Sequence, residues 1–262
     1  MNTTSAISWQ LDDQVACLRL ERPEKYNALD ADMVAGLHAA CTEIERLADV
    51  RAVIITGAGK AFCAGGDIDA WSAQDAEGFS RRWLRDGHDA FDALARLRVP
   101  VIAAINGHAL GGGLELAACA DYRIAEAQAK LGQPETGLGV IPGWSGTQRA
   151  VRRFGARAVR RMVIFGEMLP AAEAAALGVV DQVVDTGKSV AAARNLAQKL
   201  CQRSPRATEI AKMLINAAEG EERERVVDAL AGAAAFASPD LGEGLAAFRD
   251  KRAPDFDGND PS

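Results

Sequence analysis

Two glutamates, twenty residues apart, are the residues of this chain best suited to proton transfer. Glu115 lies just after a triple-glycine turn in ALGGGLELAACA (109–120), separated from it by one leucine, and Glu135 follows a proline in GQPETGLG (132–139). The apolar neighbours of Glu115 predict partial burial, which raises the pKa of a carboxyl group towards the pH at which it exchanges protons. Together the two carboxyl groups could activate a water and return a proton on adjacent carbons, which is the chemistry of conjugate hydration.

Two glycine loops supply a second chemical feature, because each follows an apolar strand pattern and precedes a helix-like segment. The loops are AFCAGGDID (61–69) and the glycines 111–113. Backbone N–H groups at such junctions lack partners within the chain and point outward. If the loops converge, their amides can hold a developing oxyanion, and loss of one such donor typically costs about a hundredfold to a thousandfold in rate.

Each of these features has a structural alternative. Glycine often serves a strand-to-helix turn only through the backbone angles that it permits. Glu115 fits equally well as a glutamate favoured by the dipole at the start of a helix, and Glu135 by itself fits a solvated loop carboxylate. The occurrence of both glutamates together with both loops favours the chemical interpretation.

Other catalytic motifs are poorly supported. The glycines of ITGAGKAFCAGG (55–66) do not form a clean G-x-G-x-x-G, so the evidence for a dinucleotide site is weak. No G-x-S-x-G elbow of a serine hydrolase occurs. Among the histidines only His108 lies near the proposed site, and a structural role is the better interpretation for it, as it is for His38 and His88.

The elements that position these residues follow from hydrophobic patterning. Residues 6–20 predict two short strands around a turn of two aspartates, and Asp30 is a plausible N-cap for the helix that follows. Further buried strands alternate with helices, which indicates a mostly parallel α/β core. From about residue 145 the pattern becomes nearly all helical, so we expect a helical C-terminal region after the core. The apolar runs that predict the buried strands are 51–59, 99–107 and 121–127.

Composition limits the class of protein. The 262 residues are 48% hydrophobic, enough for a substantial core, and the formal net charge of -6 argues against a nucleic-acid-binding protein, although a local basic patch could hold one anionic ligand. No secretory signal pattern or membrane-spanning apolar run occurs, so we expect a cytoplasmic protein without membrane association. Structural zinc and a disulfide framework are both unexpected from five scattered cysteines, Cys17, Cys41, Cys63, Cys119 and Cys201.

The glycine loops and glutamates belong to a wider similarity. The chain resembles the enoyl-CoA hydratase/isomerase family, also called the crotonases, from LERPEKYNALD (20–30) to AAFRDKRAPDF (246–256). The resemblance implies a crotonase-like α/β fold, in which a spiral of ββα units forms the core over 1–195. It also implies a helical C-terminal trimerisation region over 196–262, with assembly as a homotrimer or a dimer of trimers.

The same resemblance implies residue roles. An acyl thioester carbonyl would bind the amides of Gly66 and Gly112, while Glu115 and Glu135 add water across the trans-2 double bond of an enoyl-CoA. Neither a metal nor a further cofactor is implied, since coenzyme A is part of the substrate. Lys251, near the C-terminus, is a weaker candidate for coenzyme A, with an ordinary surface charge as the alternative. The remaining candidate contacts for coenzyme A are Arg22, Lys25, Ala28, Leu29, Ala64, Asp67 and Ile68.

One segment departs from the family pattern. The common sequence PGAGGTQ reads PGWSGTQ at 142–148, which places the indole of Trp144 near the acyl pocket. Trp71 and Trp83 could add to that pocket or could belong to the core or an interface. Acyl chain length therefore stays open. Alternatives to a hydratase are a Δ3,Δ2-enoyl-CoA isomerase, a specialised hydroxyacyl-CoA dehydratase, and a non-catalytic acyl-CoA-binding member.

Overall fold

A seven-stranded sheet forms the centre of the fold. The computed structural model describes residues 2–4 and 6–256, and the chain divides into two compact units between Lys212 and Met213. In the larger unit the sheet has the strand order β1-β2-β3-β4-β6-β8-β11; its neighbours are antiparallel from β1 to β3 and parallel from β3 onward. The strands are β1 (Asn2–Thr4), β2 (Ile7–Asp12), β3 (Val15–Leu20), β4 (Ala52–Gly57), β6 (Val101–Ile105), β8 (Tyr122–Glu126) and β11 (Gln182–Val184).

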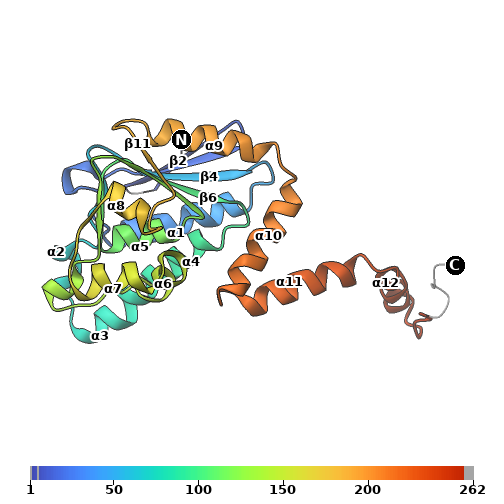
Figure 1. The fold of residues 1–262 in the computed structure, drawn as a ribbon. Coiled ribbons are helices and arrows are strands. Elements are labelled where there is room, and N and C mark those ends of the chain that lie inside the picture. The colour runs from blue at the N-terminus through green and yellow to red at the C-terminus, as the bar shows by residue number, and fades with distance from the viewer. Residues whose placement is uncertain (1, 5, 257–262) are drawn as a thin grey trace. The chain divides into compact units, whose positions relative to one another are not determined.

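Helices cover both faces of this sheet (Figure 1). Side chains alternate between the faces, so that Val53 and Ile55 of β4 join the main core while Ala52 and Ile54 join a second cluster beneath α9 (Ser189–Cys201). The near-continuous burial of β4 and β6 follows from this two-sided cover. The predicted buried strands are therefore confirmed, with bounds a residue or two inside the apolar runs.

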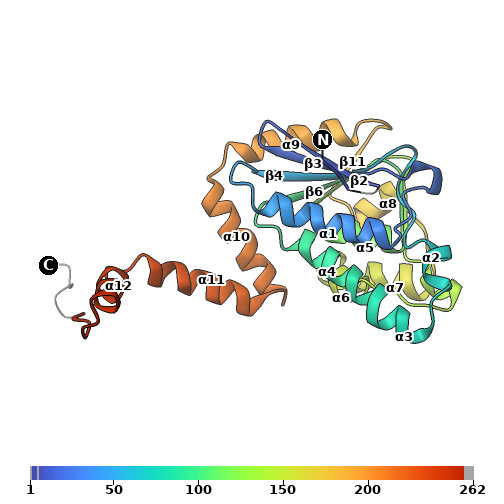
Figure 2. The same ribbon diagram turned by 180° about the vertical axis from the view of Figure 1, so that it is seen from behind.

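On the opposite face α1 (Ala31–Glu45) begins where the sequence predicts. The side chain of Asp30 accepts a hydrogen bond from the Met33 amide at 2.8 Å, which caps the helix. Its apolar side chains face the sheet, and α1 packs against α4 (Leu84–Ala95), which lies beside it in Figure 2. The buried residues of α1 are Met33, Val34, Gly36, Leu37, Ala40, Cys41 and Ile44.

A second, four-stranded sheet has the order β10-β9-β7-β5. Three times a strand of the large sheet is followed directly by a strand of the small one: β4 by β5, β6 by β7, and β8 by β9. Sequence patterning missed these strands because each is only two or three residues long. Their bounds are β5 (Ala61–Cys63), β7 (His108–Leu110), β9 (Lys130–Gly132) and β10 (Leu169–Pro170).

Short helical turns follow the strands of the small sheet and carry the candidate site residues.

The predicted, nearly continuous helix after residue 145 is wrong in part, because the strands β10 and β11 interrupt it. Each of them pairs with a strand that is distant in sequence. His108 takes a structural position in β7, where its Nδ1 accepts the Lys130 amide at 3.1 Å. The remaining elements of the larger unit are η1 (Pro23–Lys25), α2 (Ile68–Ser72), α3 (Ala76–Gly78), η2 (Phe79–Trp83), α5 (Gly112–Ala118), η3 (Glu135–Leu138), α6 (Gln148–Phe154), α7 (Ala156–Ile164) and α8 (Ala171–Ala176).

The smaller unit is helical, as expected for a C-terminal region. Helix α10 (Pro205–Ala218) crosses the division, and α11 (Arg223–Phe236) and α12 (Asp240–Asp250) follow. Within the described residues no helix is long and apolar enough to span a bilayer. Large apolar side chains are exposed along this unit, among them Leu214, Ile215, Val227, Phe236, Leu245, Phe248 and Phe256.

Candidate active site

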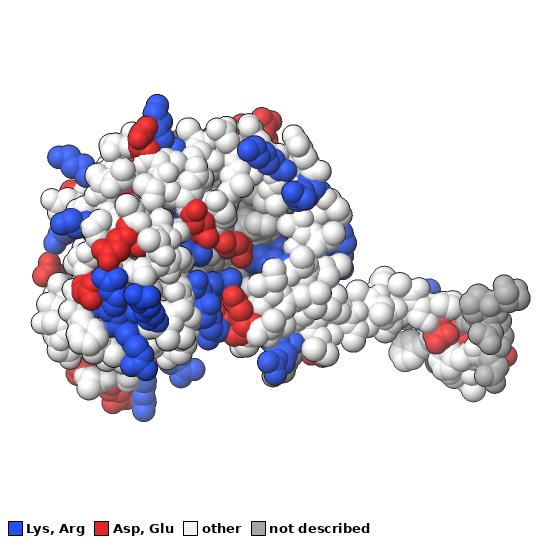
Figure 3. All heavy atoms as spheres, in the orientation of Figure 1, with Lys and Arg blue, Asp and Glu red and all other residues white. Residues whose placement is uncertain are grey.

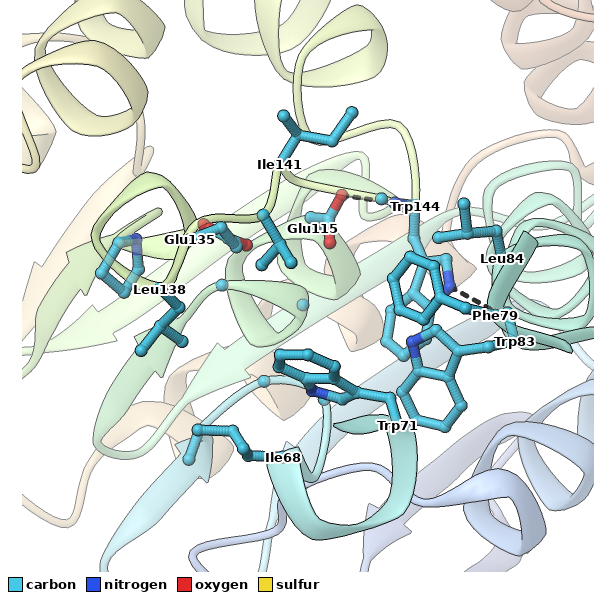
Figure 4. Close-up of a pocket in the computed structure, with 18 residues that line it drawn as sticks. Ile68, Trp71, Phe79, Trp83, Leu84, Glu115, Glu135, Leu138, Ile141 and Trp144 are labelled. Atoms are coloured by element: carbon cyan, nitrogen blue, oxygen red, sulfur yellow. Dashed lines mark hydrogen bonds between the residues drawn. The ribbon is translucent and has the colours of Figure 1, made fainter. Parts of the chain in front are cut away.

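An apolar cavity in the larger unit brings the two glutamates and the two glycine loops together. The volume of the cavity is about 110 Å³. Figure 4 shows the carboxyl groups of Glu115 and Glu135 facing the cavity, with the ring of Trp71 below them in that view. Its lining comprises Ala64, Gly65, Gly66, Ile68, Trp71, Phe79, Trp83, Leu84, Gly111, Gly112, Glu115, Pro134, Glu135, Leu138, Val140, Ile141, Gly143 and Trp144.

The two glycine loops approach each other closely. A Cβ atom built on Gly112 would lie 3.3 Å from the Gly66 nitrogen, and one built on Gly65 would lie 3.3 Å from the Gly112 nitrogen. Gly65 also has a φ of +106°, a backbone conformation that favours glycine. The loops therefore need glycine for both contact and conformation.

Both candidate amides are oriented away from backbone partners. In the bridge between Leu29 and Gly66, Leu29 bonds to the carbonyl of Gly65 at 2.8 Å and to the amide of Asp67 at 2.7 Å. The N–H of Gly66 consequently points away from Leu29. Gly112 is the first residue of α5, where an amide has no acceptor within its own helix.

Glu115 is 3% exposed, and one of its carboxyl oxygens is fixed by hydrogen bonds from the backbone. Its Oε1 accepts the backbone amides of Trp144 at 2.7 Å and Gly146 at 2.6 Å, while Oε2 turns away from that segment (Figure 4). Burial, together with the nearby charge of Glu135, raises the pKa of Glu115 to about 8, although the two amide hydrogen bonds oppose the shift. The carboxyl group can therefore exist in either protonation state near neutral pH.

Glu135 lies at the start of η3, beside Gly111. Both of its carboxyl oxygens are buried, and neither has a hydrogen-bond partner among the residues that the structure describes. Burial raises the pKa of Glu135 to about 7. A buried, unpartnered carboxyl group costs stability, which is expected at a site that must bind another molecule.

Replacement of Glu135 by Gln is expected to stabilise the protein at alkaline pH. The folded state raises the pKa of Glu135 above its unfolded value, so this group favours folding in acid and loses that contribution as the pH rises through about 7. Glu135→Gln should match the wild-type Tm at pH 4, below the unfolded pKa, and exceed it at pH 9 by about 2–4 °C for each kcal/mol of relieved destabilisation. Thermal unfolding at both pH values measures this, and an equal difference at both would contradict it.

Two further residues, which the sequence analysis did not identify, stabilise the surroundings of Glu115. Buried Gln133 donates its Nε2 to the carbonyl of Gly146 at 2.9 Å, which holds the segment that binds Glu115. Behind it, buried Arg149 pairs with Asp92 at 2.5 Å, and its positive charge opposes the rise in the pKa of Glu115. Neither residue carries a motif, and only the fold brings them to the site.

The predicted contacts for coenzyme A have mixed positions. The guanidinium of Arg22 bonds to Asp67 at 2.6 Å and to the Ala28 carbonyl at 2.9 Å. The pair holds the pKa of Asp67 below its usual range. Lys25 is half exposed and pairs with Asp69 at 3.0 Å.

Other predicted contacts lie around the mouth or beyond it. Ala64 and Ile68 line the cavity, and Leu29 bonds to the loop that contains Gly66. Lys251 belongs to the smaller unit, where it ends α12 with a φ of +53°.

Aromatic residues form much of the cavity wall. Trp71 and Trp83 both line it, so neither is purely core or interface, although Trp83 is largely buried. Phe79 begins η2, a single π-helical turn, and packs edge-on against Trp71 with ring centroids 6.0 Å apart. Such turns often occur at functional sites. The departure at Trp144 also lies here, since its indole reaches the cavity.

Positively charged side chains are concentrated in one part of the surface, although the net charge of the protein is negative. Arginines gather over α6 and α7 on the face in Figure 3. Arg161 of this group bonds to Glu167 and, at 2.7 Å, to Glu173. The basic members of α6 and α7 are Arg149, Arg152, Arg153, Arg157, Arg160 and Arg161.

Within the described part of the chain, no group of three or more His, Cys, Asp or Glu residues comes together in a way that could hold a metal ion.

Two carboxyl groups with raised pKa values, facing one apolar cavity, make this a candidate site for acid–base chemistry. Residues 10–259 match the family model described as enoyl-CoA hydratase/isomerase. The chain belongs to this family.

Individual relatives match along nearly their whole length. A probable enoyl-CoA hydratase from Mycobacterium bovis is 38% identical over 260 residues, covering 97% of this chain and 98% of that protein. Crotonyl-CoA hydratase from Syntrophomonas wolfei is 36% identical, with 94% and 95% covered. The crystal structure of an enoyl-CoA hydratase from Bacillus anthracis superposes with a TM-score of 0.79 at 34% identity, covering 97% and 100%. The crotonase fold expected from the resemblance is confirmed, and enoyl-CoA hydratase activity is supported at the level of the family.

Proposed function

We propose that this protein hydrates the trans-2 double bond of enoyl-CoA thioesters. The observation that carries the proposal is the position of Glu115 and Glu135 in one cavity, beside the converging amides of Gly66 and Gly112. A proton-transfer pair and an oxyanion site are the two requirements of conjugate addition to a thioester. Retention of both glutamates favours hydration over the isomerase and non-catalytic alternatives.

The proposed reaction uses these groups together. The thioester oxygen accepts hydrogen bonds from Gly66 and Gly112, which stabilise the negative charge of the enolate. The ionised member of the glutamate pair takes a proton from water as the water oxygen bonds to the β-carbon. The protonated member gives its proton to the α-carbon, and the product is a 3-hydroxyacyl thioester. The pair ends the cycle with the same number of protons.

Incubation of the purified protein with crotonyl-CoA tests the proposal. We expect loss of the conjugated thioester absorbance and a product heavier by one water in mass spectrometry. A 3-enoyl-CoA offered in parallel identifies an isomerase, which would convert it to the 2-enoyl isomer of unchanged mass. Binding of both thioesters without any product would favour the non-catalytic alternative and overturn the proposal.

Activity should depend on pH as a bell centred between about pH 7 and pH 8. The reaction needs one protonated and one ionised carboxyl group, and burial raises the pKa values of Glu135 and Glu115 to about 7 and about 8. Below this range both groups are protonated and no base remains; above it both are ionised and no acid remains. Values of kcat/KM, obtained from initial rates between pH 5 and pH 10, give the pH profile. A rate that is flat from pH 6 to pH 9 would contradict the assignment.

We further propose that coenzyme A lies along the segment 22–29 and that the smaller unit mediates self-association. The half-exposed side chain of Lys25, which pairs with Asp69, supports the first proposal, because it stands on the segment joined to the Gly66 loop. The exposed apolar side chains of α11 and α12 support the second, since Phe236 and Phe248 are 76% and 83% exposed. A trimer or a dimer of trimers would bury them, and a contact from Lys251 across the interface stays a prediction.

A further inference from the structure

The indole of Trp144 fills space that two glycines, Gly87 and Gly112, leave open, and it lies in van der Waals range of a third, Gly66. A Cβ atom on Gly87 would lie 2.0 Å from the indole Nε1, and one on Gly112 would lie 2.9 Å from Cζ3. A Cβ on Gly66 would lie 3.6 Å from Cη2. Gly87 stands in the interior of α4, where glycine is less favourable than alanine. The indole therefore explains a glycine that the helix itself disfavours.

Trp144 is a fixed wall. Its Nε1 donates to the carbonyl of Trp83 at 3.1 Å, as the dashed line in Figure 4 shows. Its ring centroid lies 5.0 Å from that of Trp83 and 5.0 Å from that of Phe91. The residue is only 3% exposed, and that small surface belongs to the cavity. Rotation of the indole would break the hydrogen bond and both ring contacts.

The wall stands next to the reacting atoms. The edge of the indole contacts the positions of Gly66 and Gly112, whose amides would hold the thioester oxygen. The backbone amide of the same residue binds Glu115. Phe91 lies behind the indole and does not line the cavity, so Trp144 separates the cavity from the core.

The small size of the cavity favours a small acyl group. The cavity has a volume of about 110 Å³. An apolar cavity of about 150 Å³ in another protein admits benzene. The present cavity is smaller, and the acyl chain of crotonate has four carbons.

We propose that Trp144 is the specificity-determining residue that closes the acyl pocket and restricts the enzyme to short, roughly four-carbon, acyl thioesters. This inference rests on the proposed function. The indole occupies the space into which a longer chain would extend beyond the double bond. Replacement of Trp144 by Ala opens the cavity towards Gly87 and Phe91, while the backbone amide that binds Glu115 remains.

Binding and turnover with acyl chains of two lengths test the inference. We would measure Kd for butyryl-CoA and octanoyl-CoA by calorimetry, and kcat/KM for crotonyl-CoA and trans-2-octenoyl-CoA. Wild type should favour the short chain in both. Trp144→Ala should raise the long-to-short ratio at least about tenfold, the discrimination that one methylene group typically provides in an apolar pocket. Trp144→Phe should give an intermediate ratio and serves also if the alanine variant fails to fold.

Trp9→Ala is the matched control. Trp9 is likewise a buried tryptophan of the larger unit, and its Nε1 donates a single hydrogen bond, to Glu43 at 3.2 Å, but it does not line the cavity. Its long-to-short ratio should equal that of wild type. A wild-type protein without preference for the short chain, or Trp144 variants with an unchanged ratio, would overturn the inference. Absence of hydration with a shifted binding ratio would overturn the proposed function alone, since saturated thioesters report the pocket without the reaction.

Discussion

Replacement of either Glu115 or Glu135 by Gln lowers kcat for crotonyl-CoA hydration by about 10²–10⁴-fold, the range typical of positioned acid–base groups. Glutamine keeps the size of each side chain and can accept hydrogen bonds, but it neither takes a proton from water nor gives one to carbon at neutral pH. Glu115→Gln can still accept the amides of Trp144 and Gly146 through its oxygen. The loss should therefore fall on turnover and leave the fold intact.

Measurement separates turnover from binding. Initial rates give kcat for each variant, and calorimetry with butyryl-CoA gives a Kd that should stay within a few fold of wild type. The double variant should lose little beyond the more damaged single one, because groups that act as a unit are not additive. A kcat within about tenfold of wild type in both single variants would show that these glutamates do not carry the reaction.

Gly112→Ala should reduce kcat/KM by about a hundredfold or more. The added methyl group would lie 3.3 Å from the Gly66 nitrogen and 2.9 Å from Cζ3 of Trp144, where the thioester oxygen must approach both amides. Blocking that approach removes the stabilisation that oxyanion donors provide. Alanine is the better helix former, so the loss cannot come from weakening α5.

Gly137→Ala is the matched control for this substitution. Gly137 lies in η3, two residues after Glu135, and a Cβ atom built there meets nothing within 4 Å. Its kcat/KM should remain within about twofold of wild type. An equal loss in both glycine variants would indicate a general effect on the loops, and no loss in Gly112→Ala would remove this amide from the proposed oxyanion site.

Much of the fold and the central pair of glutamates could be predicted from local sequence. Buried strands such as β4 and β6 are long enough to show apolar runs, and Asp30 supplies a local capping signal for α1. The strands of the small sheet gave no such signal, because two or three residues carry no periodicity. The family resemblance proposes Arg22 as a contact for coenzyme A; the structure adds that its guanidinium bonds to Asp67, forty-five residues away in the chain.

The residue types and their order along the chain therefore indicated the chemistry that we propose: paired carboxyl groups, two glycine loops and an apolar core that can bury them. Tertiary structure decided how these parts are tuned. The pKa values of Glu115 and Glu135 rise because distant segments remove water from them, and Gln133 reaches Glu115 only through Gly146. The shape of the pocket depends on the indole of Trp144, a loop residue that packs against Gly87 of α4. Burial and close packing are properties of residues far apart in sequence, so no local pattern reveals them.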